Sequence, residues 1–272
     1  MKGSSFLCIA WLFVFAWPAH AQTAMEGGAR AAALGGAATA LPADVWGHGN
    51  PASWATLPGR AISFFATEAF GLSALRLGAV QYVEPTRFGA FSAGARTFGF
   101  EDYRETRFLV GFARGFSLGT TRRFHAGLRL RYHQVSIPEY GLASALGLGI
   151  GGLVNVLPNL HLGFQATNLH NPKLAGRESL DRSLSLGLAY TPVDQLLVVV
   201  DAYQDPDFSL SFRGGIEVQP VPVLALRAGM TTEPSRFTAG AGLRLGKLAA
   251  DLAGEKHEVL GWSPAISFGV QW

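Results

Sequence analysis

The sequence predicts an all-β fold: a transmembrane antiparallel β-barrel of about 14 strands, with an N-terminal hatch or plug segment. Apolar residues alternate with small or polar ones from about residue 60 onward, and tight connections alternate with longer charged ones, as in outer-membrane barrels. The chain has 272 residues, 49% of them hydrophobic and 15% charged. No stretch after the first twenty or so residues is apolar for long enough to span a bilayer as a helix, so we expect the apolar residues to be dispersed over strands.

The first residues have the pattern of a secretory signal peptide, assigned to residues 1–21. Lys2 precedes an apolar run from Phe6 to Trp17, and the small-x-small site Ala19-His20-Ala21 follows it. The single cysteine, Cys8, lies within this run, so the mature chain has no thiol for a disulfide or a metal site. This pattern predicts export.

Residues 60–272 are predicted to form the barrel. The clearest alternation is at residues 123–133, where Phe124, Leu128 and Tyr132 face one side and arginines and histidines face the other. The fourteen strands are expected near 61–69, 74–83, 87–97, 107–117, 121–135, 142–156, 159–168, 182–190, 194–203, 208–218, 221–231, 236–245, 247–254 and 263–272. Alternation alone would also suit a soluble β-sandwich, so the connections decide between the two architectures.

The connections differ on the two sides of the predicted barrel. Those at Leu157-Pro158 and Gln219-Pro220 are tight and uncharged, whereas those at 98–106 and 169–181 are longer and carry charges. Short periplasmic turns and longer outer loops are typical of a bacterial outer-membrane barrel. We therefore expect an outer-membrane location in contact with lipid, with both termini in the periplasm.

The last strand ends in an alternating apolar series with a terminal aromatic residue. Its outward residues are Ile266, Phe268, Val270 and Trp272. This series is similar to the C-terminal signal by which bacterial barrels are recognised for insertion. We expect the barrel-assembly machinery to be a partner during insertion.

Residues 22–59 do not alternate and are predicted to form a periplasmic hatch or plug. Gly28 to Ala40 is rich in alanine and glycine, and Pro42 to Pro51 contains turn formers. A disordered tail is the alternative, but the apolar content disfavours it. The expected hatch residues are Leu34, Trp46, Asn50, Pro51 and Trp54.

The run from Gly28 to Ala37, followed by Asn50-Pro51-Ala52, resembles the N-terminal signature of the PorV/PorQ family, relatives of the fatty-acid transporter FadL. Later pieces such as Leu186 to Tyr190 and Leu226 to Gly229 are also similar to that family. The resemblance implies a fourteen-stranded barrel with a hatch. It also implies an accessory role in protein secretion or surface assembly of the type IX kind, with other secretion-system membrane proteins as partners. The alternative is a FadL-like channel for hydrophobic or fatty-acid-like small molecules.

One predicted strand carries the densest set of inward polar residues. They are Arg123, His125, Arg129, Arg131 and His133. As a ligand site, this stripe would hold an anionic group such as a carboxylate through forked guanidinium donors. The alternative is that these side chains pair with Glu217, Asp251 or the hatch, because buried charges need partners.

Other function classes are disfavoured. The net charge of +3 comes without a basic run, so no nucleic-acid partner is expected. His125 and His133 would lie roughly 26 Å apart along one strand, so they cannot share a metal or a proton. With no catalytic motif in the sequence, we expect no enzyme activity, no cofactor and no metal. Arg114, on the outward register, is expected to reach the membrane interface near a short turn.

Overall fold

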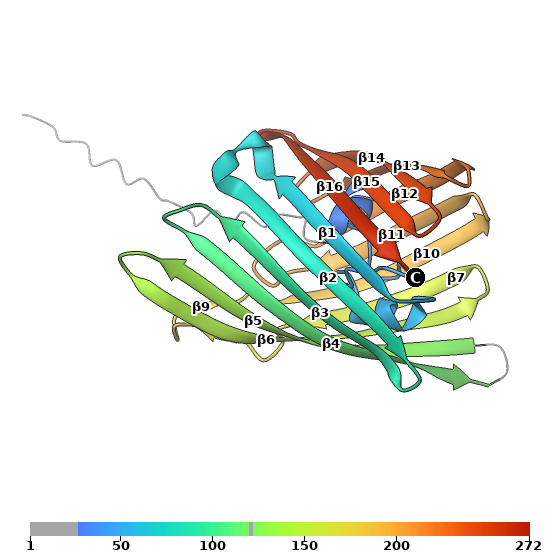
Figure 1. The fold of residues 1–272 in the computed structure, drawn as a ribbon, viewed down its shortest axis with the longest axis horizontal. Coiled ribbons are helices and arrows are strands. Elements are labelled where there is room, and N and C mark those ends of the chain that lie inside the picture. The colour runs from blue at the N-terminus through green and yellow to red at the C-terminus, as the bar shows by residue number, and fades with distance from the viewer. Residues whose placement is uncertain (1–26, 120–121) are drawn as a thin grey trace, which may run out of the picture.

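The computed structural model describes residues 27–119 and 122–272, and the expected signal peptide lies outside them. Fourteen antiparallel strands close into a single barrel (Figure 1). The barrel strands are β1 (Ala61–Glu68), β2 (Arg76–Thr86), β3 (Gly89–Gly99), β4 (Arg104–Leu118), β5 (Arg122–Ile137), β6 (Gly141–Leu157), β7 (Leu160–Thr167), β10 (Ser183–Val193), β11 (Leu196–Gln204), β12 (Ser211–Val221), β13 (Leu224–Thr231), β14 (Arg236–Leu245), β15 (Leu248–His257) and β16 (Gly261–Gln271).

Each barrel strand pairs with its neighbours in the chain, and β1 pairs with β16 to close the cylinder. The closure register runs from Ala61 opposite Gln271 to Thr67 opposite Ala265. All fourteen strands overlap those expected from the sequence, so the predicted antiparallel barrel of about 14 strands is confirmed. The two-stranded hairpin of β8 (Lys173–Leu174) and β9 (Glu178–Ser179) was not predicted, and it lies in the connection between β7 and β10.

The two faces of the wall differ in chemistry because successive strand residues point to opposite sides. On β5, Leu128, Leu130 and Tyr132 are exposed on the outside, whereas Arg129 and His133 are buried inside. Exposed leucine, phenylalanine and valine side chains occupy the outward register of strands all around the barrel. This apolar outer surface is that of a barrel whose solvent is lipid.

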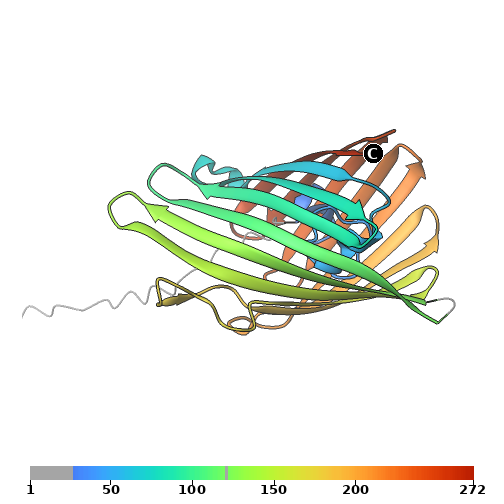
Figure 2. The same ribbon diagram turned by 60° about the horizontal axis from the view of Figure 1, so that its bottom comes forward.

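The barrel wall is taller on one side than on the other (Figure 2). Strands β4, β5 and β6 have 15, 16 and 17 residues, whereas β7 and β13 have 8 each. The pairing of β6 with β7 begins at Gly149 opposite Thr167. Residues 141–148 of β6 therefore extend beyond the end of β7, on the side where the longer connections lie.

Residues 27–60, called the N-terminal segment below, run through the interior of the barrel (Figure 1). The segment contains the helix α1 (Gly28–Ala33), which packs on β13 to β16, and the 3-10 helix η1 (Pro51–Thr56), which packs on β2 to β6. The Asn50 side chain caps η1 by accepting a hydrogen bond from the Ala52 N–H at 3.0 Å, and Pro51 occupies the first position, where no N–H is needed.

Glycines on the inner wall make room for this segment. A Cβ added at Gly111 would lie 2.1 Å from Cζ3 of Trp54, and one added at Gly151 would lie 2.1 Å from Oδ1 of Asn50. Real Cβ atoms do not approach this closely, so these wall positions need glycine. The small inward residues seen in the sequence therefore lie against chain, not against open space.

No helix in residues 27–119 or 122–272 is long and apolar enough to cross a membrane.

Candidate functional site

A cavity of about 440 Å³ lies inside the barrel, on the side of the longer connections. Its floor is the N-terminal segment, through Ala38, Thr39 and His48. The connection containing β8 and β9 contributes Leu174 and Leu180. The volume is within the range of small-molecule sites.

Arginines dominate the charge of this cavity. Six line it, from β3, β4, β5, β12 and β14, against three carboxylates: the arginines are Arg96, Arg107, Arg129, Arg131, Arg213 and Arg236, and the acids are Glu105, Glu178 and Asp181. Apolar side chains such as Phe98 and Val135 lie among them. The cavity is therefore amphipathic and basic.

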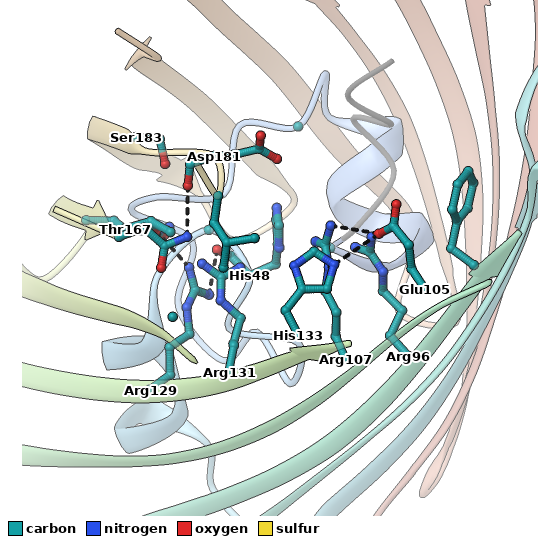
Figure 3. Close-up of a pocket in the computed structure, with 18 of the residues that line it drawn as sticks. His48, Arg96, Glu105, Arg107, Arg129, Arg131, His133, Thr167, Asp181 and Ser183 are labelled. Carbon is teal, nitrogen blue, oxygen red and sulfur yellow. Dashed lines mark hydrogen bonds and ion pairs between the residues drawn. The ribbon is translucent and has the colours of Figure 1, made fainter. Parts of the chain in front are cut away.

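Arg129 is committed to holding the N-terminal segment. Its Nη1 donates to the backbone oxygens of Gly47 at 2.7 Å and His48 at 2.9 Å, and its Nη2 donates to Oγ1 of Thr167 at 3.2 Å. Figure 3 shows Arg129 and Arg131 side by side on β5, next to His48. The strand supplies both because residues two apart share a face.

A second group of charges gathers around Glu105 on β4. Nη2 of Arg107 lies 3.1 Å from the Glu105 carboxylate, and Nε2 of His133 lies 3.2 Å from it (Figure 3). Nε of Arg107 also donates to Nε2 of His133 at 3.0 Å. Nε and Nη2 of Arg107 therefore already have partners within the protein.

The structure divides the predicted stripe on β5 into two parts. Arg129, Arg131 and His133 line the cavity, whereas Arg123 and His125 do not. Arg123 is exposed near the short-turn end, and His125 lies in the same part of β5, on the far side of Gly127, against which Pro51 and Ala52 of η1 pack. Since the segment crosses the lumen at this level, the five residues do not form one site.

The predicted pairing of the stripe with Glu217 and Asp251 is wrong. Glu217 accepts from Arg227 at 2.6 Å and from Arg30 at 2.8 Å, and Asp251 accepts from Arg227 at 2.7 Å. Four strands separate β5 from β12 around the barrel, and the N-terminal segment lies between them. Arg129 fits the other alternative, because it donates hydrogen bonds to the backbone of the segment that was expected to form the hatch.

The predicted hatch residues all lie in the packed part of the segment. Leu34 and Trp54 are fully buried, and Trp46 packs edge-on against Phe65 with ring centroids 5.8 Å apart. Asn50 donates through Nδ2 to the backbone oxygens of Thr39 at 2.7 Å and Gly152 at 2.8 Å.

Further wall residues that sequence reasoning missed also hold the segment. Asp201 accepts from the backbone N–H groups of Ala38 and Thr39, both at 2.9 Å. Oγ1 of Thr238 accepts from the Gly35 N–H at 3.0 Å, and Oγ of Ser267 accepts from the Ala29 N–H at 2.8 Å. A lone acid in the apolar run of β11 was the one available signal, because a buried carboxylate requires donors.

Asp44 is a buried acid within the segment. Burial raises the pKa of its carboxyl to about 6, against the opposing effects of the Trp46 N–H and of the charges on Arg30 and Arg129. Its Oδ1 accepts from the Trp46 N–H at 3.2 Å. The segment thus contains a group that titrates in mildly acidic conditions.

Arg213 was also missed from the sequence. Its guanidinium carbon lies 3.6 Å from the centroid of the Tyr203 ring, and both residues line the cavity. Arg213 lies on β12 and Tyr203 on β11. In the register of these two strands Ser211 is opposite Tyr203 and Arg213 is opposite Asp201, so Arg213 and Tyr203 are diagonal neighbours. No cluster of three or more histidines, cysteines or acids that could hold a metal occurs in the part of the chain described.

These features define a class of protein: a closed transmembrane-type β-barrel whose lumen contains its own N-terminal segment below an amphipathic cavity. Solved structures with this fold include the toluene transporter TbuX of Ralstonia pickettii, at 14% identity and a TM-score of 0.63, over 91% of this chain and 99% of that one. A Pseudomonas aeruginosa FadL homologue matches at 12% identity and 0.60, over 92% and 97%. The chain therefore has the fold of FadL-like outer-membrane channels.

The toluene transporter TodX of Pseudomonas putida matches at 14% identity and a TM-score of 0.61, over 89% of this chain and 96% of that one. No family model matches the chain, and no curated protein matches it. The comparisons thus support the FadL-like part of the sequence resemblance and give no support to the specific PorV/PorQ assignment.

Proposed function

We propose that this protein is an outer-membrane channel for hydrophobic or fatty-acid-like small molecules, with the N-terminal segment as its hatch. The observation that carries the proposal is the cavity of about 440 Å³ above that segment, inside a barrel with an apolar outer surface. A cavity that mixes apolar side chains with arginines suits a molecule with an apolar body. The similar structures include a toluene transporter and a monoaromatic hydrocarbon channel.

The N-terminal segment supports the closed state of this channel. Its backbone is held by side chains from several parts of the wall, among them Arg129 on β5, Asp201 on β11 and Ser267 on β16. These bonds are polar, so each can exchange for water when the segment moves. Passage toward the short-turn side requires such a movement.

The test is deletion of the gene followed by uptake of radiolabelled toluene and octanoate, with a sugar of similar size as the control solute. We expect slower uptake of at least one apolar compound, unchanged uptake of the sugar, and recovery when the gene is restored. Unchanged uptake of both compounds would contradict the proposal.

A secretion or surface-assembly role is the second candidate, and it rests on the N-terminal pattern from Gly28 to Ala37 and Asn50 to Ala52. Protein partners in a secretion system belong to this candidate alone. The same deletion strain separates the two functions: a loss of surface-exposed proteins with normal uptake would favour secretion, and the reverse would favour the channel.

A further inference from the structure

Arg213 differs from Arg107 and Arg236, which line the same cavity, in how its charge is balanced. Arg236 pairs with Glu255, Arg107 pairs with Glu105, and Arg129 is held by backbone oxygens and Thr167. Arg213 forms no salt bridge within residues 27–119 and 122–272; the carboxylate of Asp201, opposite it on β11, accepts from Ala38 and Thr39 of the segment. The close contact of the Arg213 guanidinium is the face of the Tyr203 ring, at 3.6 Å.

Arg227 shows how the wall balances the charge of a buried guanidinium. Arg227, also inward on the barrel wall, has two acid partners, Glu217 at 2.6 Å and Asp251 at 2.7 Å. A buried guanidinium needs such anions, because removing it from water costs free energy that a hydrogen-bonded partner offsets. Arg213 is partly buried and faces the cavity, so an anion that enters the cavity supplies the partner that the wall does not.

The stack on Tyr203 also prepares Arg213 to bind. A guanidinium lying on an aromatic face is held in orientation, while its N–H donors lie in its own plane and remain available at its edge. Two parallel N–H donors match the two oxygens of a carboxylate. A single arginine without an acid partner balances one negative charge, which favours a monoanion.

The position of Arg213 places such an anion next to the N-terminal segment. A Cβ added at Gly36 of the segment would lie 3.8 Å from Cδ and Nη1 of Arg213, so the guanidinium lies close above the segment's backbone. Phe98 and Val135 line the same cavity and can receive an apolar body.

From these contacts we infer that Arg213, stacked on Tyr203, is the binding site for the carboxylate of a small amphipathic monocarboxylic acid. This inference rests on the proposed channel function and deepens it, because it gives the solute a charged group and assigns that group to β12. Of the β5 arginines, which the sequence offered as candidates for this role, Arg129 instead holds the N-terminal segment.

The test measures binding of para-fluorobenzoate to the detergent-purified full chain by fluorine NMR at neutral pH, with para-fluorobenzamide as the neutral probe of the same shape. We expect the benzoate to bind and the benzamide to bind at least about tenfold more weakly. Arg213→Gln should weaken benzoate binding by about tenfold or more, and Tyr203→Leu should weaken it less, because the charge remains. Arg244→Gln is the matched control, since Arg244 is an inward arginine of β14 that does not line the cavity, and it should bind as the unchanged protein does.

Three results would overturn the inference: equal binding of the two probes, unchanged binding by Arg213→Gln, or displacement of the benzoate by inorganic phosphate at lower concentration than by acetate. Heat-modifiable mobility on gels confirms that each variant is folded. Failure here is distinguishable from failure of the channel: normal solute-dependent uptake without benzoate binding removes only the inference, whereas benzoate binding without any uptake defect removes only the channel.

Discussion

Asp201 and Thr39 form a tight contact between the barrel wall and the N-terminal segment. Oδ2 of Asp201 accepts from both the backbone N–H of Thr39, at 2.9 Å, and its hydroxyl, at 2.8 Å. The same oxygen accepts from the Ala38 N–H at 2.9 Å. One carboxylate oxygen thus serves three donors of the segment, which makes this the contact at which to test how the segment is held.

Replacing this carboxylate should loosen the segment without unfolding the barrel. Asp201→Ala removes three charge-assisted hydrogen bonds and leaves two backbone N–H groups without acceptors, for a net loss of about 2–4 kcal/mol in segment docking. Amide hydrogen exchange of residues 38–41 should then accelerate by about a hundredfold. Asp194→Ala, on the exposed turn between β10 and β11, is the control and should leave this exchange unchanged.

Wall glycines should not tolerate a methyl group where the segment packs. Gly111→Ala places a Cβ 2.1 Å from the ring of Trp54, and we expect it to destabilise the protein by about 1–3 kcal/mol. Gly214→Ala is the matched substitution, because its Cβ would meet no atom closer than 3.8 Å. The temperature at which gel mobility changes measures both; equal midpoints would mean that the segment yields without cost.

Deleting the segment should open the lumen. Removal of residues 22–55 with the signal peptide retained leaves a fourteen-stranded wall whose inward face is rich in glycine, serine and alanine, so water should fill the axis. Planar bilayers should then show conductance steps that the intact chain lacks. A deletion variant that inserts and conducts no better than the intact chain would show that the wall or the outer connections close the barrel.

The docking of the segment should depend on pH through Asp44. Because burial raises its pKa from 3.8 to about 6, the folded state binds the proton of Asp44 more tightly than the unfolded state does. The stabilisation of the folded state by this proton is therefore complete below about pH 4. It is lost as the pH rises through about 6, a change of about 3 kcal/mol in the free energy of unfolding. Hydrogen exchange of residues 44–48 should slow as the pH falls through this window, after correction for intrinsic rates. Asp44→Asn should abolish the change, and Asp102→Asn should preserve it.

The orientation in the membrane is predicted from the connections. Single cysteines at Asp102 and Lys173, in the longer connections, should react with an impermeant maleimide on intact cells, and one at Pro158 should react only after the outer membrane is disrupted. The opposite labelling pattern would place the termini outside the cell and reverse the direction of the proposed channel.

The sequence alone determined the barrel and its number of strands. Alternation at residues 123–133 and tight turns such as Leu157-Pro158 are local features, because a strand's two faces and its turns depend on adjacent residues. The small inward residues also indicated that something must fill the lumen. The apolar residues Leu34, Trp46 and Trp54 indicated that the N-terminal segment packs inside the barrel, but they did not indicate its path.

Only the tertiary structure decided which inward charges meet. The register of β12 on β13 places Glu217 opposite Arg227, the path of the N-terminal segment adds Arg30, and four strands lie between Glu217 and the β5 arginines. The tertiary structure also brings Tyr203 under Arg213, which lie on adjacent strands. These pairings depend on strand register and on the course of a segment more than a hundred residues distant in sequence, and alternation specifies the face on which a side chain lies but not its partner across the lumen.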